Sequence, residues 1–364
     1  MPFLMGDQSN LLNCTPTDAA ARLDAFMTAR GVPAYRGAQV AHRLWKTPAP
    51  DFEAMLELPA SLRAELAATF SIPRLPLVTQ QSSADGTQKF LFRLRDGEGI
   101  ETVAIPEGDR LTLCISSQAG CALQCAFCAT GAMGFARNLE AWEIAAQVRE
   151  LLLLDTPLRA TNVVFMGMGE PLMNWGAVDV ALTILNDPRG LGIGARHITV
   201  STVGILPGIE ALAARPEQFR LALSLHAPTD ALRHSLMPIN TKYPLAAVVA
   251  AAREFDRRVT FEYVLLGGVN DGPAQAVDLA RLARECRAFV NLIPLHPGGS
   301  LGFTPSSRGA TAAFMRTLRA RGVTAALRKS RGLDISAACG QLRVERLGRR
   351  APGSPEEHGQ VHIA

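Results

Sequence analysis

Residues 161–186 read TNVVFMGMGEPLMNWGAVDVALTILN and contain one complete strand–loop–helix unit. The apolar, β-branched run Asn162–Met166 predicts a buried strand, and Gly176–Asn186 has the length and apolar spacing of a helix. Between them lies a turn in which Gly167 and Gly169 permit close approach of the backbone to a ligand. The unit therefore predicts a parallel α/β fold with polar residues at the end of a strand.

The same alternation of strand and helix repeats on both sides of this unit, mostly at the spacing of a βαβ unit. The expected strands are Leu111–Ile115, Asn162–Met166, His197–Val200, Phe219–Leu225, Val259–Leu265 and Phe289–Ile293. The clearest helices are Asn138–Leu154, Gly176–Asn186, Tyr243–Phe255 and Pro273–Arg287. We expect an α/β fold, a partial TIM-like (βα)6 barrel rather than a closed eight-stranded one.

Polar residues mark the ends of these expected strands. In βα barrels the chemistry lies at the carboxyl ends of the strands, so such residues are the first candidates for a site. The ends carry Cys121–Cys128, Gly169-Glu170-Pro171, Ser201, Ser224, His226 and His296. We expect these residues to converge on one mouth of the barrel.

The composition is that of a globular protein. The chain has 364 residues, 48% of them hydrophobic and 19% charged, which suits about two domains and excludes collagen, coiled coil and wholesale disorder. No stretch reaches the roughly 18 to 20 uninterrupted apolar residues of a membrane span. The first basic residue is Arg22, so the positive region of a secretory signal is missing. We expect a cytoplasmic protein without a membrane partner.

Seven cysteines occur, and Cys121, Cys125 and Cys128 stand four and three residues apart. An odd number in a chain without an export signal argues against a disulfide framework. Three clustered thiols suit a [4Fe–4S] cluster with one iron open to a small chelating ligand. A structural zinc site needs four ligands, and the motif has no fourth cysteine and no histidine. The remaining alternative is three buried cysteines on one face of a helix.

The spacing Cys-x-x-x-Cys-x-Phe-Cys, residues 121–128, resembles the motif of the radical S-adenosylmethionine (SAM) superfamily. Further motifs along the chain are similar to those of the RlmN/Cfr family of RNA adenine methyltransferases. They are Gly-Met-Gly-Glu-Pro at 167–171, Ser-Leu-His at 224–226, Leu-Met-Pro-Ile-Asn at 236–240, and Arg331 followed by Ala-Ala-Cys-Gly-Gln at 337–341. The resemblance covers nearly the whole chain, from Glu101 to Leu342.

The resemblance implies two molecules of SAM per turnover, one as methyl donor and one as radical source. Cys339 would carry the methyl group as S-methylcysteine. Cys114 would then close a transient disulfide with Cys339 and release the product, and Glu101 would be the proton acceptor.

The resemblance also implies the cofactor contacts. Cys121, Cys125 and Cys128 would bind a [4Fe–4S] cluster that also binds exchangeable SAM. The implied SAM-binding residues are Gly169, Glu170, Ser201, Ser224, Leu225, His226 and His296. His296 departs from the family pattern, which usually has an asparagine there. An imidazole cannot donate and accept hydrogen bonds in the geometry of an amide, so its role as a cofactor contact is an open question.

The chain begins with short helices and ends with a basic segment. Ala19–Arg30, Gly37–Lys46 and Ser61–Phe70 predict a compact module that resembles a helix-hairpin-helix used against nucleic-acid backbones. Between Arg308 and Arg350 there are eleven basic and two acidic residues, whereas the whole chain has a net charge of +4. Such a segment attracts phosphate backbones, although a solvated arginine-rich helix face would have the same composition.

These features predict four parts of the chain. We expect a helical, RNA-binding-like domain at 1–75 and a linker with a β-hairpin at 76–106. The radical SAM barrel with its methyl-carrier loop is expected at 107–348, and a mobile tail at 349–364.

The resulting hypothesis is an enzyme, a monomeric radical SAM methyltransferase that modifies carbon 2 of an adenosine in 23S rRNA and in tRNA. Its electron donor would be a protein such as a flavodoxin. Carbon 2 lies between two ring nitrogens and is electron-poor, so it cannot attack a sulfonium methyl, whereas a radical can add there. Two alternatives stay open: methylation of carbon 8, as in the Cfr branch, and a non-catalytic iron–sulfur protein that binds nucleic acid or transfers electrons.

Overall fold

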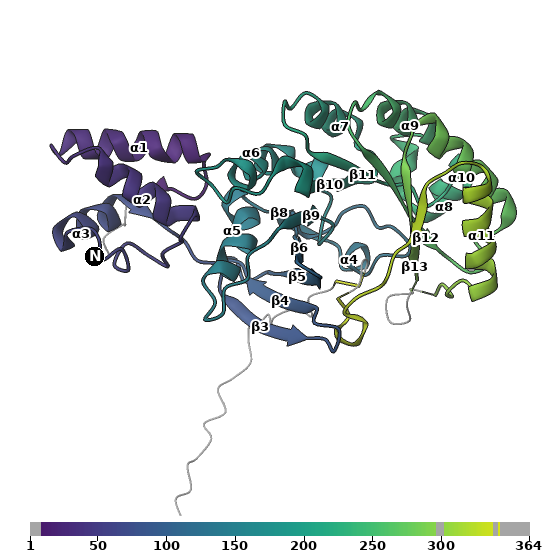
Figure 1. Ribbon diagram of the computed structural model, residues 1–364, viewed down its shortest axis with the longest axis horizontal. Coiled ribbons are helices and arrows are strands. Elements are labelled where there is room, and N and C mark those ends of the chain that lie inside the picture. The colour runs from purple at the N-terminus through teal and green to yellow at the C-terminus, as the bar shows by residue number, and fades with distance from the viewer. Residues whose placement is uncertain (1–8, 296–301, 338–340, 343–364) are drawn as a thin grey trace, which may run out of the picture.

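The computed structural model describes residues 9–295, 302–337 and 341–342 (Figure 1). Within these residues a ten-stranded sheet has the order β14-β13-β12-β11-β10-β9-β6-β5-β4-β3. Neighbouring strands from β6 to β14 are parallel, whereas β3, β4, β5 and β6 are antiparallel. The sheet curves but stays open, so the expected partial α/β barrel is confirmed.

The parallel part contains all the predicted strands and one more. In the described residues these strands are β6 (Arg110–Cys114), β9 (Asn162–Phe165), β10 (Ile198–Thr202), β11 (Arg220–Ser224), β12 (Val259–Leu265), β13 (Phe289–Pro294) and β14 (Ala325–Leu327). The strand β14 was not predicted, because its apolar run is only three residues long. The central strands β9 and β10 alternate between fully buried and half-buried residues, as expected for strands with helices on one face and the barrel interior on the other.

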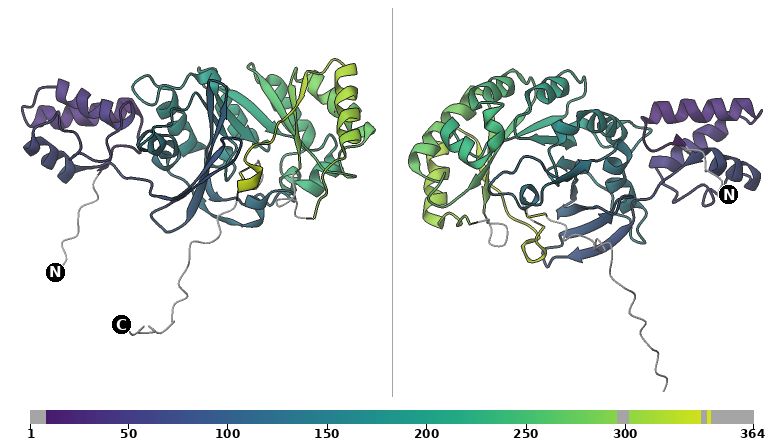
Figure 2. Two further views of the ribbon diagram at one scale, coloured as in Figure 1. Left: turned by 60° about the horizontal axis from the view of Figure 1, so that its bottom comes forward. Right: turned by 180° about the vertical axis from the view of Figure 1, so that it is seen from behind.

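Helices connect the parallel strands and cover the outer face of the sheet (Figures 1 and 2). They are α5 (Ala141–Leu152), α6 (Trp175–Asn186), α7 (Leu206–Ala213), α8 (Asp230–Leu236), α9 (Leu245–Glu254), α10 (Pro273–Glu285) and α11 (Arg308–Ala320). Single 3-10 turns occur at Pro171–Asn174, Ala195–His197, Pro238–Thr241 and Leu333–Ile335. The hydrophobic core lies between these helices and the sheet.

The N-terminal helices α1 (Pro16–Ala29), α2 (Tyr35–Trp45) and α3 (Ala60–Thr69) stand to one side of the barrel (Figure 1). Thr15 caps α1, because its hydroxyl accepts the N–H of Asp18 at 3.2 Å. Gly31, with φ of +65°, forms the turn after α1. The strand β1 (Ser9–Asn10) pairs with β2 (Phe70–Ser71), so both ends of this module are tied together.

A buried arginine joins the helical module to the barrel. Arg149 of α5 is fully buried, and its guanidinium donates to the carbonyl of Leu44 at 2.9 Å and to the carbonyl of Ala49. It also lies 3.3 Å from the carboxylate of Glu150. A buried guanidinium without such partners would be costly, so these contacts fix the module against α5.

Residues 76–106 differ from the expected linker. The strands β3 (Leu77–Ser82), β4 (Gln88–Arg93) and β5 (Gly99–Glu107) extend the barrel sheet beyond β6. The predicted hairpin is formed by β4 and β5, but the expected linker includes the edge strand β3. All side chains of β3 are exposed, so this strand lacks the apolar alternation by which a strand is recognised.

After β14 the chain crosses the open side of the barrel toward the opposite edge of the sheet. Residues 328–337, here called the crossing segment, reach the turn between β3 and β4 (Figure 2). The carboxylate of Asp334 accepts the hydroxyl of Ser83 at 2.6 Å, and Asp85 accepts the N–H of Gly332 at 3.0 Å. The two edges of the open sheet are therefore linked through these hydrogen bonds.

In the part of the chain that is described, no helix has the length and apolar character needed to span a membrane. The mobile tail expected at 349–364 lies outside the described residues.

Candidate active site

A cavity of about 170 Å³ lies at the carboxyl ends of the parallel strands. Ser201 of β10, Ser224 of β11, Val264 of β12 and Pro294 of β13 contribute to its wall. Because carboxyl ends of parallel strands meet at one edge, the barrel brings these residues together. The polar residues that the sequence places at the strand ends, where they belong to the described residues, thus face one common cavity.

The cysteine loop closes one side of this cavity. It lies between β7 (Gln118–Gly120) and α4 (Ala129–Ala132), and β7 pairs with β8 (Phe135–Asn138). The pairing of β7 with β8 holds the two ends of the cysteine loop together. Gly120 is required there, because its φ is +76° and a Cβ on it would lie 2.0 Å from the carbonyl oxygen of Gly134.

Cys121, Cys125 and Cys128 all line the cavity as free cysteines. Burial raises the pKa of the Cys121 thiol to about 11, and burial together with the other two cysteines raises the pKa of Cys125 further. The segment is a loop rather than a helix, so the alternative of three cysteines on one helical face is wrong.

The donor set fits a [4Fe–4S] cluster. Three thiols from one loop surround a shared space, which is the local ligand number that leaves one iron open. Within the described residues no group of three or more His, Cys, Asp or Glu side chains lies close enough together to hold a single metal ion. A single ion needs short bonds, about 2.3 Å for a thiolate on zinc. The larger inorganic body of a cluster holds its thiolates further apart, and three thiols around one cavity suit it.

The Gly-Glu-Pro turn after β9 forms the opposite wall. The carboxylate of Glu170 accepts the N–H of Leu172 at 3.0 Å and the N–H of Val203 at 2.9 Å. Burial raises the pKa of Glu170 to about 7. Gly169 has φ of +96°, and a Cβ on it would lie 2.5 Å from that of Gln118. The loop therefore needs glycine to bring Glu170 to the cavity.

The Ser-Leu-His motif follows β11. The hydroxyls of Ser201 and Ser224 lie 3.5 Å apart. His226 has a positive φ of +55°, its Nδ1 accepts the N–H of Val264 at 3.1 Å, and its ring packs edge-on against Phe127 of the cysteine loop. Burial lowers the pKa of His226 to about 3, so the ring is neutral.

Leu225 differs from its neighbours in this motif. Its side chain is fully buried and is not among the residues that line the cavity. Its backbone N–H donates to the carbonyl of Glu262 at 3.1 Å. Leu225 therefore contributes to the strand pairing and packing that hold the two polar residues beside it.

A second cavity of about 230 Å³ adjoins the first. It is lined by Cys114, a buried thiol at the end of β6, and by three cationic side chains of the crossing segment, Arg328, Lys329 and Arg331. The two cavities share the lining residues Met166, Ile293, Pro294, Arg328 and Leu342. A ligand in one cavity would therefore lie next to a ligand in the other.

Of the remaining predicted residues, one lies in the strand β5 and two fall outside the described residues. Glu101 of β5 is buried and lies two residues from Val103, which pairs with Cys114. Cys339 and His296 lie outside the described residues. The described residues on either side of Cys339 reach the cavities: Ala337 lines the second, and Gln341 lines the first.

Two charged residues of the site were missed in the sequence. Glu262 of β12 is buried, its Oε1 accepts the amide of Asn291 at 3.0 Å, and its Oε2 has no hydrogen-bond partner among the described residues. Burial raises its pKa. A lone acid within the apolar run Val259–Leu265 was the available signal. Arg328, which lines both cavities, carried no signal because it sits among many other arginines.

Comparison with known proteins agrees with this architecture. Residues 115–280 match the model of the radical SAM superfamily, and residues 9–72 match the ribosomal RNA large subunit methyltransferase N-terminal domain. The chain is 69% identical over 355 residues to the probable dual-specificity RNA methyltransferase RlmN of Gemmatimonas aurantiaca, which covers 98% of this chain and 99% of that protein. It is 48% identical to the dual-specificity RNA methyltransferase RlmN of Anaeromyxobacter dehalogenans, over 94% of each chain.

A solved structure shows the same fold. The crystal structure of a radical SAM methyltransferase from Sphaerobacter thermophilus superposes with a TM-score of 0.85 and is 47% identical, over 92% of this chain and 99% of that one. The open barrel and the cavity bounded by three cysteines define a radical SAM enzyme. At this identity over nearly its whole length, the chain belongs to the RlmN family of radical SAM RNA methyltransferases. The resemblance read from the motifs is confirmed, and with it the use of SAM and a [4Fe–4S] cluster that the superfamily implies.

The close contact at Gly169 generates a first prediction. In Gly169→Ala the new Cβ would meet Gln118, and the positive φ would be strained. We expect the free energy of unfolding to fall by about 2 kcal/mol and SAM to bind at least about tenfold more weakly. Calorimetry and equilibrium binding would measure the two effects. Gly176→Ala is the matched control, because a Cβ there meets nothing within 4 Å. If Gly169→Ala bound SAM as tightly as the wild type, the close approach of the Gly169 backbone to Gln118 would not be needed for the site.

The buried neutral histidine generates a prediction about pH. The pKa of His226 is about 3 in the folded protein and about 6.5 in an unfolded chain. Between these values the unfolded chain binds the extra proton, so the free energy of unfolding falls as the pH is lowered below about 6.5, by at most about 1.4 kcal/mol per pH unit. Asparagine in His226→Asn tolerates the positive φ and can accept the N–H of Val264, but does not titrate.

Urea unfolding of both proteins between pH 7 and pH 5 would measure this contribution. We expect the wild type to lose stability toward acid relative to His226→Asn. Parallel pH profiles for the two proteins would show that the histidine is not held neutral.

Proposed function

We propose that this chain methylates carbon 2 of an adenosine in 23S rRNA and in tRNA, with Cys339 as the methyl carrier. The observation that carries the proposal is that two cavities adjoin, one bounded by three cysteines and the other by Cys114 and a basic rim. Radical chemistry started in the first cavity can thus reach a nucleotide held in the second. The names of the relatives, dual-specificity RNA methyltransferases, support the two RNA substrates.

The cofactors would bind in the first cavity. Cys121, Cys125 and Cys128 would ligate the [4Fe–4S] cluster as thiolates, leaving one iron for the amino and carboxylate groups of exchangeable SAM. Two molecules of SAM would be used per turnover. When bound, the cluster and SAM supply a methyl group and one-electron chemistry.

The residues of the chain would orient SAM and exclude water. The carboxylate of Glu170 can accept a hydrogen bond from the ammonium group of SAM next to the glycine turn of Gly169. Ser201 and Ser224 present hydroxyls on the neighbouring strands, and His226 closes the wall against the cysteine loop. Leu225 would act through its backbone. His296 is retained as a proposed contact, with one hydrogen bond instead of the two of an amide.

Three residues would carry the methyl group and release the product. The thiol of Cys339 would take the first methyl group by displacement. The one-electron chemistry of the second SAM would remove one hydrogen atom from that methyl group, so that its carbon can bond to carbon 2 of the adenine. Glu101 would accept the proton that leaves carbon 2, and the remaining electron would return to the cluster. Cys114 would then bond to the sulfur of Cys339 as the bond from sulfur to the transferred carbon breaks, and that carbon would take up a proton to become the methyl group of the product. The resulting disulfide would be reduced by an external thiol before the next turnover.

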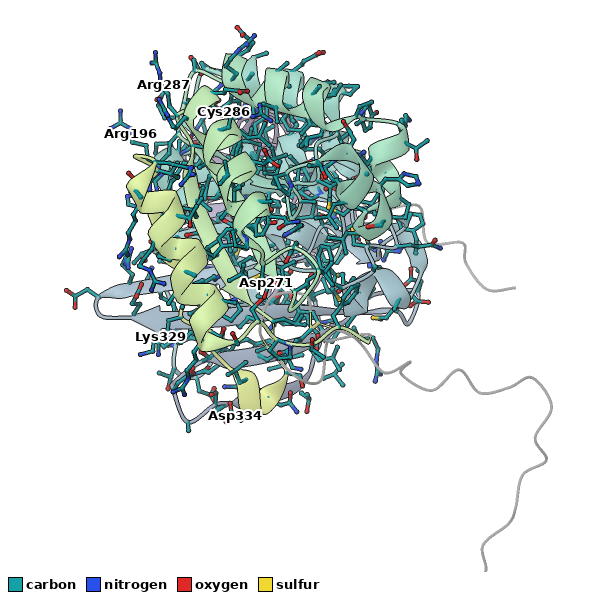
Figure 3. The ribbon with its side chains drawn as sticks, turned by 90° about the vertical axis from the view of Figure 1, so that its right-hand side faces the viewer. Arg196, Asp271, Cys286, Arg287, Lys329 and Asp334 are labelled. Carbon is teal, nitrogen blue, oxygen red and sulfur yellow. The ribbon has the colours of Figure 1, made fainter. Side chains whose placement is uncertain are left out.

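The RNA would reach the site through the basic rim of the second cavity. Lys329 is exposed, and Arg331 is half-buried. In Figure 3 Lys329 and Asp334 lie in the lower part of the view, whereas Arg196 and Arg287 lie at its top. The helical module of α1, α2 and α3 would hold another part of the RNA. We further propose that the protein is a cytoplasmic monomer that receives electrons from a donor such as a flavodoxin.

The decisive experiment uses protein loaded anaerobically with iron and sulfide, methyl-labelled SAM, a reductant, and unmodified 23S rRNA and tRNA transcripts. We expect label on Cys339 by peptide mass spectrometry and 2-methyladenosine by nucleoside mass spectrometry. Cys339→Ala should abolish both labels while keeping the absorbance of the cluster.

Each of the other outcomes would indicate a different activity or mechanism. Label on carbon 8 would show the alternative position of methylation. Methylated RNA from Cys339→Ala would overturn the carrier mechanism. A cluster without label on protein or RNA would indicate a non-catalytic iron–sulfur protein, provided that a competent relative methylates the same RNA under the same conditions.

The basic rim generates a prediction about salt. If Lys329 and Arg331 each neutralise an RNA phosphate, replacing either by Ala should weaken binding and reduce the slope of log K against log salt by about 0.7 to 0.9. Filter binding of tRNA at salt concentrations from about 50 to about 300 mM would measure both the affinity and the slope. Arg287→Gln removes an exposed charge that lies away from Lys329 in Figure 3, and it should change neither quantity. Unchanged slopes in all variants would exclude the rim from the RNA contact.

A further inference from the structure

Lys89 of β4 forms a buried ion pair with Glu101 of β5. The ammonium nitrogen lies 3.1 Å from Oε1 of the carboxylate, and the two side chains are only 11% and 5% exposed. Lysine and glutamate are among the residues least often buried, and they are buried almost only when they are paired. No role was assigned to Lys89 from the sequence, because a single charge in a strand has no meaning until the neighbouring strand shows what it faces.

The pairing of the strands places this ion pair on the same face of the sheet as Cys114. Lys89 stands opposite Val103 in the register of β4 and β5, and Val103 stands opposite Cys114 in the register of β5 and β6. Residues directly opposite each other share a face, and so do residues two positions apart on one strand. Lys89, Glu101, Val103 and Cys114 therefore occupy one face. Diagonal neighbours on such a face are about 7 to 8 Å apart, close enough for long side chains to interact.

This face continues into the second cavity. Ile105 and Glu107 follow Glu101 and Val103 at alternate positions of β5, and both line the cavity with Cys114. The other face of β4 carries Phe90 and Phe92, which are buried in the hydrophobic core. The strand is thus packed by its aromatic face, while Lys89 projects toward the reactive side.

Stability alone does not explain such a pair. The cost of removing two charges from water can exceed their attraction, and buried ion pairs can often be replaced by apolar residues without loss of stability. A buried ammonium group at Lys89 is explained if the carboxylate that it pairs with takes part in the reaction. Glu101 has such a task if it accepts a proton beside Cys114.

We propose that Lys89 is a positioning residue that holds the carboxylate of Glu101 charged and oriented toward the product-release chemistry at Cys114. The proposal rests on the function proposed above for Glu101 and Cys114. Lys89 itself exchanges no proton with the RNA, and its ammonium group anchors one carboxylate oxygen. It acts only after the methyl carbon has become bonded to the adenine, because Glu101 has no task in the methylation of Cys339.

The test separates the two halves of the reaction. Enzyme already methylated on Cys339 is mixed with RNA, SAM and reductant, and samples are quenched over time. A denaturing gel measures the covalent protein–RNA adduct, and nucleoside mass spectrometry measures 2-methyladenosine. We expect Lys89→Met and Lys89→Gln to methylate Cys339 and form the adduct at the wild-type rate, but to resolve it about 100-fold more slowly, the cost of a misplaced catalytic group.

Matched variants define the readout. Cys114→Ala marks complete arrest at the adduct, and Glu101→Gln should resolve it as slowly as Lys89→Met. The double variant Lys89→Met/Glu101→Gln should be no slower than Glu101→Gln alone, because the two residues act as one unit. Lys89→Arg keeps the charge and should restore most of the rate. Arg93→Met removes an exposed charge from the same strand and controls for weaker attraction of RNA.

The outcomes distinguish the two proposals. Normal resolution by Lys89→Met with slow resolution by Glu101→Gln would overturn the role of Lys89 and leave that of Glu101 intact. Normal resolution by Glu101→Gln would overturn the role of Glu101 itself. An equal loss of Cys339 methylation and adduct resolution in Lys89→Met would indicate a general structural defect. If the single variant does not fold, Lys89→Arg and the double variant decide the question, since neither leaves an unpaired buried charge.

Discussion

The crossing segment between the two edges of the open sheet is the constraint on which the active site depends. An open parallel barrel leaves one side of its interior uncovered, and residues 328–337 span that side. They are tied at one end through Asp334 and Gly332 to the turn between β3 and β4. Farther along, the carbonyl of Leu342 accepts the hydroxyl of Thr130, beside the cysteine loop, at 2.6 Å. The crossing segment therefore joins the basic rim to the antiparallel extension, and Leu342 contacts the helix that follows the cysteine loop.

The tightness of this attachment has a local cause. Gly332 has φ of +62°, and a Cβ on it would lie 2.9 Å from Cγ2 of the buried Thr87 and 2.8 Å from Cβ of Ala337. Only glycine lets the backbone turn so close to β4. Arg328, Lys329 and Arg331 are placed on the cavity as a consequence of this path. The position of the basic rim, which we propose contacts RNA, is therefore set by where the chain crosses and not only by the number of basic residues.

Several elements were predictable from residues close together in the sequence. The six parallel strands and their helices follow from apolar periodicity, and the cysteine loop follows from the spacing of Cys121, Cys125 and Cys128. The edge strand β3 was not predictable, because its side chains are exposed and its backbone is ordered only by pairing with β4. Glu262 and Lys89 were missed for a related reason. A single charge in an apolar strand has no meaning until the partner strands show what it faces.

The sequence by itself determined the class of fold, the cysteine loop, the glycine turn before Glu170 and the resemblance to the RlmN/Cfr family. These features are local, because the apolar periodicity, the positions of the glycines and the spacing of the cysteines can each be recognised within a few tens of consecutive residues. Only the tertiary structure decided that two cavities adjoin, that Lys89 and Glu101 share a face with Cys114, and that the crossing segment links the edges of the sheet. Those facts depend on strand register and on contacts between residues up to 251 positions apart, as for Ser83 and Asp334, which no local pattern encodes.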